Sequence, residues 1–175
     1  DQVGLEFSFA GPNNVGGRTR AILVDNEDSE RLYSAGITGG LFISTNGGNS
    51  WSPAFDDQLS INVSSIDQAD NGVVYVGTGC SFELEGASKG GGPSSPGTGM
   101  YKSTDRGETW TRIEGTNPEI DPRFSYINDI AVMPGNANHL VAATAQTAGG
   151  GGGLMISTDG GSTWENGACR PQTTL

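Results

Sequence analysis

The stretch that decides the fold is GLFISTNGGNSW at residues 40–51, because it occurs three times along the chain. It returns as GMYKSTDRGETW at residues 99–110 and as GLMISTDGGSTW at residues 153–164. The repeated serines stand 59 and 54 residues apart, close to the about 40–50 residues of known blade repeats, and loop insertions can supply the excess. The sequence therefore predicts an array of three similar units.

Segments rich in apolar and β-branched residues precede each copy, separated by polar or Gly-rich turns, as expected of short strands. We expect first strands at residues 21–25, 63–67 and 127–132, and second strands at residues 32–36, 73–78 and 140–144. The third strand of each unit ends at the repeated serine, and the fourth begins at the repeated tryptophan. Four short antiparallel strands per unit, without helical periodicity, predict an all-β fold of about three β-propeller blades.

The units divide the chain into three expected blades at residues 1–57, 58–116 and 117–175, with an N-terminal segment before the first and a C-terminal tail after the third. Propellers typically have about 4–8 blades, and their sheets have neighbours on both sides, so we expect the array to be part of a larger propeller. Its two open faces should make the isolated chain unstable or self-associating, because apolar surface would remain in water.

The turn between the third and fourth strands reads Ser-x-Asp-x-Gly-x-Thr-Trp, with Asn46 replacing Asp in the first copy. Asp and Asn side chains accept hydrogen bonds from nearby backbone N–H groups, which closes an Asx-turn. Gly48, Gly107 and Gly161 supply the positive φ that such a loop needs. Each tryptophan is expected to bury its ring against a neighbouring sheet while its indole N–H finds an acceptor.

These turns resemble Asp-boxes, also called bacterial neuraminidase repeats, at residues 44–51, 103–110 and 157–164. The resemblance implies a propeller similar to the secreted bacterial sortilin-like and xyloglucanase-like propellers. In that family the box is a structural turn, usually away from the catalytic face, so its residues are expected to hold the fold and not to catalyse. The structural residues expected on this basis are Ser44, Asn46, Gly48, Trp51, Ser103, Asp105, Gly107, Trp110, Ser157, Asp159, Gly161 and Trp164.

The resemblance does not reach the catalytic residues of sialidases or xyloglucanases. Sialidases hold the substrate carboxylate with three arginines, and Pro122-Arg123-Phe124 only faintly resembles their Phe-Arg-x-Pro signature. Xyloglucanases carry a catalytic Asp in a segment like Arg-Thr-Asp-x-Gly-Gly, where this chain has Ile37. An aliphatic side chain cannot transfer a proton, and inverting hydrolysis needs two carboxyl groups. No catalytic residue is therefore assigned.

Charge and composition narrow the classes of partner. Nine Lys and Arg against 20 Asp and Glu leave a net charge of −11, which would repel nucleic acid. No apolar run approaches the about 18 residues that cross a bilayer, so no membrane insertion is expected.

The sequence offers few metal ligands. His139 is the only histidine, and Asp25-Asn26-Glu27-Asp28 lacks the ligand spacing of a calcium loop. Neither a metal nor a cofactor is expected.

The longest insertion in the repeat pattern is the stretch 80–99, between the second and third strands of the second unit. Long propeller loops at this place build binding faces, so Phe82, Glu83 and Glu85 form the candidate binding loop.

Cys80 and Cys169 are the only cysteines, and an exported protein permits a disulfide between them. They lie in different units, and whether they pair is left open.

The resemblance and the composition together predict a secreted or cell-surface, non-catalytic propeller segment that binds protein or carbohydrate through its loops, within a larger surface complex. Its partner is then a protein, a glycan, or further blades of the same full-length chain. Any export signal is expected to have been removed or never to have been part of this chain. One alternative is a fragment of an extracellular glycoside hydrolase, xyloglucanase-like or sialidase-like, with catalytic residues partly outside this chain. Another is a purely structural part of a cell-surface assembly.

Overall fold

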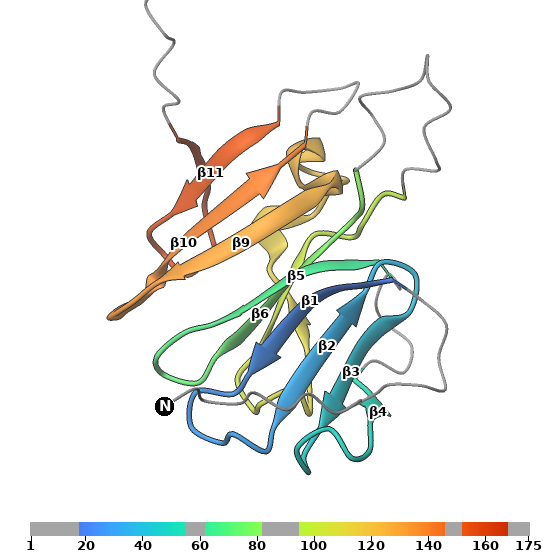
Figure 1. Cartoon of the computed structure of the whole chain (residues 1–175). Coiled ribbons are helices and arrows are strands. Elements are labelled where there is room, and N and C mark those ends of the chain that lie inside the picture. The colour runs from blue at the N-terminus through green and yellow to red at the C-terminus, as the bar shows by residue number, and fades with distance from the viewer. Residues whose placement is uncertain (1–17, 55–61, 82–94, 146–151, 168–175) are drawn as a thin grey trace, which may run out of the picture.

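The computed structural model describes residues 18–54, 62–81, 95–145 and 152–167 (Figure 1). Within these ranges the chain forms three four-stranded antiparallel sheets, called blades 1, 2 and 3 below. Two short 3-10 turns, η2 (Glu114–Thr116) and η3 (Pro122–Ser125), are the helical elements of the described residues. The predicted all-β fold of three propeller blades is confirmed.

Each blade is a meander in which consecutive strands pair with each other. Blade 1 consists of β1 (Thr19–Val24), β2 (Leu32–Gly36), β3 (Gly40–Ser44) and β4 (Ser52–Pro53). Blade 2 consists of β5 (Val63–Gln68), β6 (Val74–Thr78), β7 (Met100–Ser103) and β8 (Thr111–Arg112). Blade 3 consists of β9 (Ile127–Met133), β10 (Asn136–Thr144), β11 (Gly153–Ser157) and β12 (Glu165–Asn166).

Most strand positions follow the sequence pattern, and the fourth strands show the clearest difference. Each of them begins one residue after the repeated tryptophan and not at it. The indole bonds back into its own turn, with Trp110 Nε1 donating to the Gly107 carbonyl at 3.1 Å, so the tryptophan still belongs to the turn. In blade 3, β10 starts inside the expected turn because Asn136 already pairs with Met133 across a tight hairpin.

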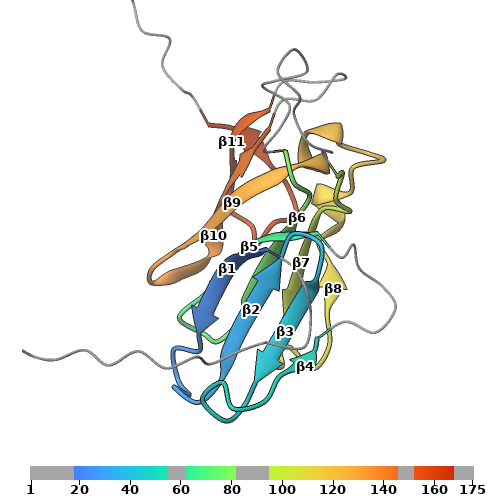
Figure 2. The same ribbon diagram turned by 45° about the vertical axis from the view of Figure 1, so that its right-hand side comes forward.

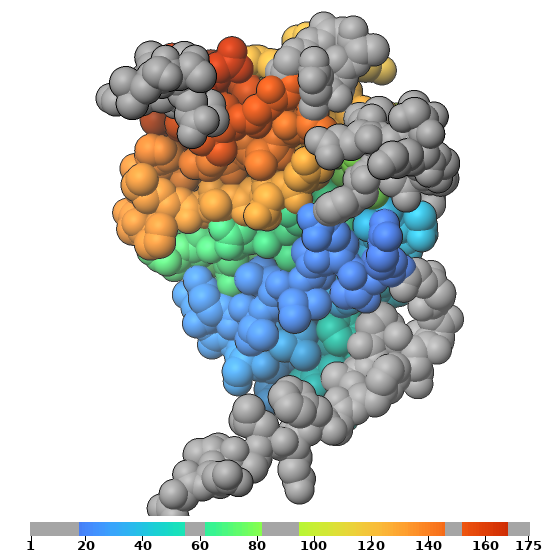
Figure 3. Space-filling model, turned by 45° about the horizontal axis from the view of Figure 1, so that its top comes forward, coloured from blue at the N-terminus to red at the C-terminus, as the bar shows by residue number. Residues whose placement is uncertain are grey.

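The first strands of the three blades lie side by side, with β5 packed between β1 and β9 (Figures 1 and 2). Figure 3 shows the blades as successive bands, with blade 2 between blade 1 and blade 3. In every blade the β-turns that follow the first and third strands lie at one end, called the turn end. The second strands end, and the first strands begin, at the opposite end, called the loop end.

Two apolar clusters fill the spaces between the blades. The first cluster joins Leu41 of blade 1 to Val76 of blade 2, and the second joins Met100 of blade 2 to Met155 of blade 3. Successive residues of a strand point to opposite faces, so β6 contributes Val76 to the first cluster and Tyr75 to the second. Each blade interface is thus a layer of apolar side chains between two sheets.

Strand pairing defines a forward face on each blade, turned toward the following blade, and a backward face, turned toward the preceding one. The forward faces carry Tyr33, Ala35, Leu41 and Ile43 in blade 1, Tyr75, Gly77, Met100 and Lys102 in blade 2, and Val141, Ala143, Leu154 and Ile156 in blade 3. The backward faces carry Ile22, Leu32, Ser34 and Phe42 in blade 1, Ile66, Val74, Val76 and Tyr101 in blade 2, and Ile130, Leu140, Ala142 and Met155 in blade 3. Within the described ranges, no further sheet covers the backward face of blade 1 or the forward face of blade 3.

Candidate functional site

The three turns between the third and fourth strands share one set of hydrogen bonds. The hydroxyls of Ser44, Ser103 and Ser157 accept from the N–H of the glycine four residues on, at 2.9, 2.7 and 2.9 Å. Each hydroxyl also donates to the Asn or Asp oxygen two residues on, at 3.0, 2.7 and 2.8 Å. The tryptophan Nε1 donates to the carbonyl of the same glycine at 3.0, 3.1 and 2.9 Å. The side chains of the predicted boxes therefore bond to their own turns.

The glycines of the second and third boxes also lie against the blade before them or its linker. Gly48, Gly107 and Gly161 have φ of 88°, 91° and 91°, a region that L side chains rarely adopt because Cβ contacts the backbone. A Cβ on Gly107 would lie 2.3 Å from Ile43 Cδ1 of blade 1, and a Cβ on Gly161 would lie 2.8 Å from Ile113 Cγ2. The second and third boxes therefore close their own turns and pack against the preceding blade or its linker.

Asp105 and Asp159 differ from Asn46 in the direction of one hydrogen bond. The Oδ2 atoms of the two aspartates accept from the hydroxyl of the threonine four residues on, at 2.5 and 2.6 Å. Asn46 instead donates from Nδ2 to Ser50 Oγ at 2.8 Å, because an amide nitrogen is a donor. The first box is therefore neutral, whereas the other two each carry a carboxylate that accepts several hydrogen bonds.

Those hydrogen bonds set the ionisation of both aspartates. The side-chain and backbone donors of Thr109 hold the pKa of Asp105 at about 2, below its ordinary 3.8. The corresponding donors of Thr163 hold the pKa of Asp159 at about 2. Hydrogen bonds to the charged form lower a pKa because protonation would remove acceptors from donors that are already in place.

A pH titration tests this arrangement. Because the folded pKa of about 2 lies below the ordinary 3.8, the two boxes stabilise the fold fully above pH 3.8, and this contribution is lost as pH falls through about 2. Carboxyl chemical shifts in NMR should give midpoints near 2 for both residues. Thr109→Val should raise the midpoint of Asp105 and leave that of Asp159 unchanged as an internal control. Midpoints near 3.8 in the unsubstituted chain would contradict the geometry.

Arg106 links the second box to blade 1. It stands where the other two boxes have glycine and shares their positive φ, at 57° against 64° and 71°. Its carbonyl accepts from Arg31 Nη1 at 2.9 Å and from the Tyr33 hydroxyl at 3.2 Å, and its guanidinium pairs with Glu27. Sequence reasoning missed this contact. Its only signal was an arginine at a position that is glycine in the other two copies.

Asp25 lies beside this contact and joins the same two blades. Asp25 is 4% exposed, and its carboxylate accepts hydrogen bonds from the N–H groups of Glu27 and Asp28 at 3.0 and 3.1 Å, and from Gln68 Nε2 of blade 2 at 3.0 Å. Burial by itself raises the pKa of Asp25, but these hydrogen bonds outweigh it and the pKa lies below its ordinary value. Burial also raises the pKa of Tyr33, which donates to Asp25, to about 12.

At the loop end, Ile37 occupies the position where the resemblance to xyloglucanases places an acid. It is 8% exposed, and its N–H donates to the Arg18 carbonyl at 3.2 Å.

The candidate binding loop of Phe82, Glu83 and Glu85 lies outside the described residues, as does Cys169. Cys80 is buried, and pairing between the two cysteines stays open.

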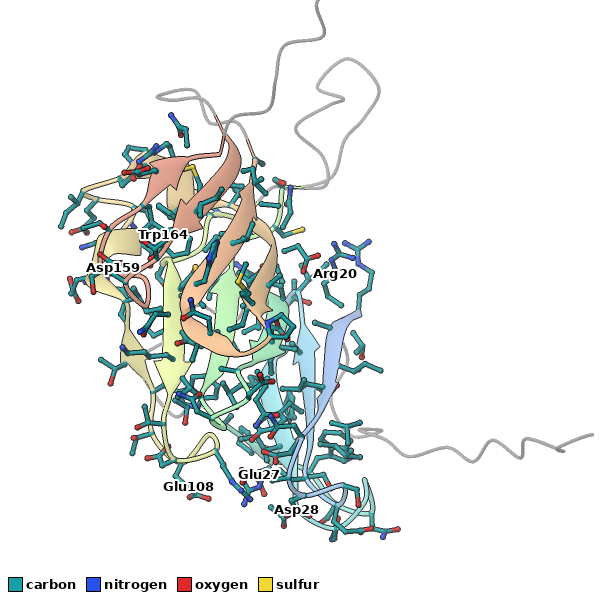
Figure 4. All side chains as sticks on the ribbon, turned by 90° about the vertical axis from the view of Figure 1, so that its left-hand side faces the viewer. Arg20, Glu27, Asp28, Glu108, Asp159 and Trp164 are labelled. Atoms are coloured by element: carbon teal, nitrogen blue, oxygen red, sulfur yellow. The ribbon has the colours of Figure 1, made fainter. Side chains whose placement is uncertain are left out.

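A hollow of about 430 Å³ lies between blades 1 and 2 at the turn end, near the second box. Its walls include Arg31, Ser52 and Glu108 and are mostly polar. Figure 4 shows Glu108 with Glu27 and Asp28 at this end of the sheets. Across the four described ranges, no cluster of three or more His, Cys, Asp or Glu is placed to hold a metal ion. In the same ranges, no helix is long and apolar enough to span a membrane.

The three sheets and their shared turns define the class of protein: the chain carries three blades of an Asp-box β-propeller. The model of the BNR/Asp-box repeat family matches residues 101–112 and 155–166, which contain the second and third boxes. Xyloglucanase Xgh74A of Acetivibrio thermocellus is 31% identical over 116 residues, which cover 58% of this chain and 12% of that enzyme.

Solved structures show the same likeness. An ancestral GH74 enzyme superposes with a TM-score of 0.61 at 25% identity, covering 86% of this chain and 18% of that one. YCF48 from Cyanidioschyzon merolae superposes with a TM-score of 0.58 at 18% identity, covering 88% of this chain and 38% of that one. The chain thus spans only a small part of the xyloglucanases it resembles and well under half of YCF48.

Proposed function

We propose that this chain is a secreted or cell-surface, non-catalytic propeller segment that binds a protein or a carbohydrate through its loops, as part of a larger surface complex. The observation that carries the non-catalytic part is Ile37. The side chain that replaces the xyloglucanase-like acid is aliphatic and buried in the loop after β2. Neither proton transfer nor charge stabilisation is open to that side chain.

The binding part of the proposal rests on the loop end. The second strand of every blade ends there, and the first strand begins there (Figure 1). Loops carried on a rigid scaffold are the usual place for binding residues, and the longest of them holds Phe82, Glu83 and Glu85. A second solved YCF48 structure has this fold at a TM-score of 0.56 and is bound to D1 peptide, which supports a protein partner. The xyloglucanase relatives support a carbohydrate.

Activity and binding assays test the proposal together. We expect no release of reducing ends from xyloglucan by the 175-residue chain and measurable binding, by calorimetry, of xyloglucan oligosaccharides or of peptides from a panel of varied charge. Phe82→Ala with Glu83→Gln and Glu85→Gln should weaken that binding about tenfold, a loss of about 1.4 kcal/mol. Glu30→Gln, an exposed carboxylate between β1 and β2 at the opposite turn end, is the matched control and should leave binding unchanged. Equal binding by both variants would contradict the loop assignment.

The second candidate is a segment of an extracellular glycoside hydrolase. The 31% identity with xyloglucanase Xgh74A favours it. Turnover of xyloglucan above a buffer control, abolished by one carboxylate substitution, would establish this candidate and remove the first. Because the chain covers 12% of that enzyme, such a segment would draw catalytic groups from parts of a protein beyond these blades.

A further inference from the structure

The hollow between blades 1 and 2 plays no part in the function proposed for the loop end. It lies between two sheets whose four strands are all described, and not on an outer face of the array. Ser50 and Ser52 line it from blade 1, and Gly107 and Glu108 line it from the second box, with Glu108 at the turn end in Figure 4. Its volume of about 430 Å³ is within the range of ordinary small-molecule sites.

Two side chains of opposite charge line this hollow without an ionic partner. Arg31 directly precedes β2, and Glu108 belongs to the turn before β8. The ion pairs of the described residues involve neither the Arg31 guanidinium nor the Glu108 carboxylate. A ligand that neutralises both groups must therefore carry an anion and a cation of its own.

Arg31 lines the hollow with one of its donors unused. Its Nη1 donates to the Arg106 carbonyl at 2.9 Å, which fixes the direction of the guanidinium. Its Nε is buried and has no acceptor among the described residues. An unpaired buried donor is unfavourable, so an acceptor that reaches it is stabilising. A carboxylate in the hollow would offer two oxygens to the planar fork of this guanidinium.

The turn that holds Arg31 in place has a strained backbone. Arg106 has φ of 57° and is the one non-Gly residue of the described ranges with a positive φ. Such a conformation costs free energy, and strained residues gather at ligand sites. Here the strained residue presents its carbonyl to Arg31 and is followed directly by Gly107 and Glu108 of the wall. One turn therefore positions both charged groups of the hollow.

The charges around the hollow narrow the class of ligand. A simple anion would be repelled by Glu108 and by the net charge of −11, and a simple cation would be repelled by Arg31. A zwitterion is neutral overall, so neither repulsion opposes it. The hydroxyls of Thr45, Ser50 and Ser52 on the blade 1 wall can each donate or accept, which suits a polar side chain on the ligand.

We propose that the hollow binds a free polar α-amino acid, with the ligand carboxylate on Arg31 and the ligand ammonium on Glu108. The carboxylate accepts charge-assisted hydrogen bonds from the guanidinium, and the ammonium donates to the Glu108 carboxylate. The wall hydroxyls contact the side chain of the ligand. The hollow lies at the turn end, so this site is separate from the loop-end ligand and does not rest on the proposed function.

Titration of L-glutamine into the isotope-labelled 175-residue chain, followed by NMR, tests the site. We expect saturable shifts of the Thr45, Ser52 and Glu108 amides and no shift of the Ser81 amide at the loop end. N-acetyl-L-glutamine lacks the ammonium, and L-glutaminamide lacks the carboxylate. Each of these two probes should bind about tenfold more weakly than L-glutamine.

Two substitutions assign the charged groups of the ligand. Glu108→Gln should weaken L-glutamine binding about tenfold and leave N-acetyl-L-glutamine unaffected, because that probe has no ammonium to lose. Arg31→Gln should weaken L-glutamine equally and leave L-glutaminamide unaffected. Glu108 is exposed, so its variant keeps the fold and decides the outcome even if Arg31→Gln is unstable. Glu30→Gln, an exposed carboxylate at the same end but outside the hollow, is the matched control and should bind like the parent.

The opposite results overturn the proposal. They are L-glutamine that gives no saturable shift, equal binding of the three probes, or a Glu108→Gln variant that binds like the parent. Saturation of the same amides by D-glucose and not by L-glutamine would assign the hollow to a neutral sugar instead. The triple substitution at Phe82, Glu83 and Glu85 should leave L-glutamine binding unchanged, so the turn-end site and the loop-end function can each fail alone.

Discussion

Replacing Gly79 with Ala should destabilise the fold by about 3–5 kcal/mol, which combines backbone strain with overpacking. Gly79 has φ of 96°, and a Cβ there would lie 2.3 Å from the Ser125 carbonyl oxygen and 2.9 Å from the Gly97 nitrogen. Both are backbone atoms, Ser125 in the linker that leads into blade 3 and Gly97 in the loop before β7, so they cannot move aside as a flexible side chain does. The substitution should also separate the loop end of blade 2 from that linker.

Gly135→Ala is the matched control for this prediction. Gly135 has a similar φ of 77°, but a Cβ there would meet nothing within 4 Å. It therefore carries the backbone strain without the overpacking, and the expected cost is about 1–2 kcal/mol. Urea unfolding at one low protein concentration measures both variants, so that association does not differ between samples. Equal losses for the two substitutions would show that the close approach at Gly79 is absent.

Phe124→Ala is the second large effect, with an expected loss of about 3–5 kcal/mol for a fully buried aromatic side chain. Phe124 lies in η3 and is 0% exposed within the cluster between blades 2 and 3. Its ring centroid lies 5.1 Å from that of Trp164, with the planes inclined at 60°. Removal of the ring would leave a cavity beneath the third box and remove the aromatic pair.

Two control substitutions should each cost less stability than Phe124→Ala. Phe124→Leu keeps most of the apolar volume and should cost less than about 1.5 kcal/mol. Ile120→Ala, in the same linker but 75% exposed, should stay within about 0.5 kcal/mol of the parent. A loss below about 1 kcal/mol for Phe124→Ala, measured by the same urea unfolding, would show that the linker does not seal the interface between blades 2 and 3.

The strands were predictable because their signals are local. Composition predicted β2 at Leu32–Gly36, because β-branched and apolar residues there are bounded by turn residues. The repeated serines predicted where β3, β7 and β11 end. The start of each fourth strand was placed one residue too early. The tryptophan bonds back to a glycine three residues before it, and composition alone does not show that bond.

The position of the candidate site was only partly predictable. The hydrogen bonds of Asp105 and Asp159 join residues at most four positions apart, so the repeated motif contains all their partners. The contacts of Arg106 with Tyr33 and Glu27 join residues 73 and 79 positions apart. No local pattern contains both partners of such a contact, so sequence reasoning missed it.

By itself, the sequence determined the repeat, the all-β blades and the chemistry of the turns, because each depends on residues close together in the chain. It also showed an isoleucine at the position where the resemblance to xyloglucanases places an acid. Only the tertiary structure decided which face of each blade is covered, because burial of Leu41 and exposure of Leu154 at equivalent positions depend on whether another sheet lies against them. The apolar pattern is the same in both blades, and the neighbour makes the difference.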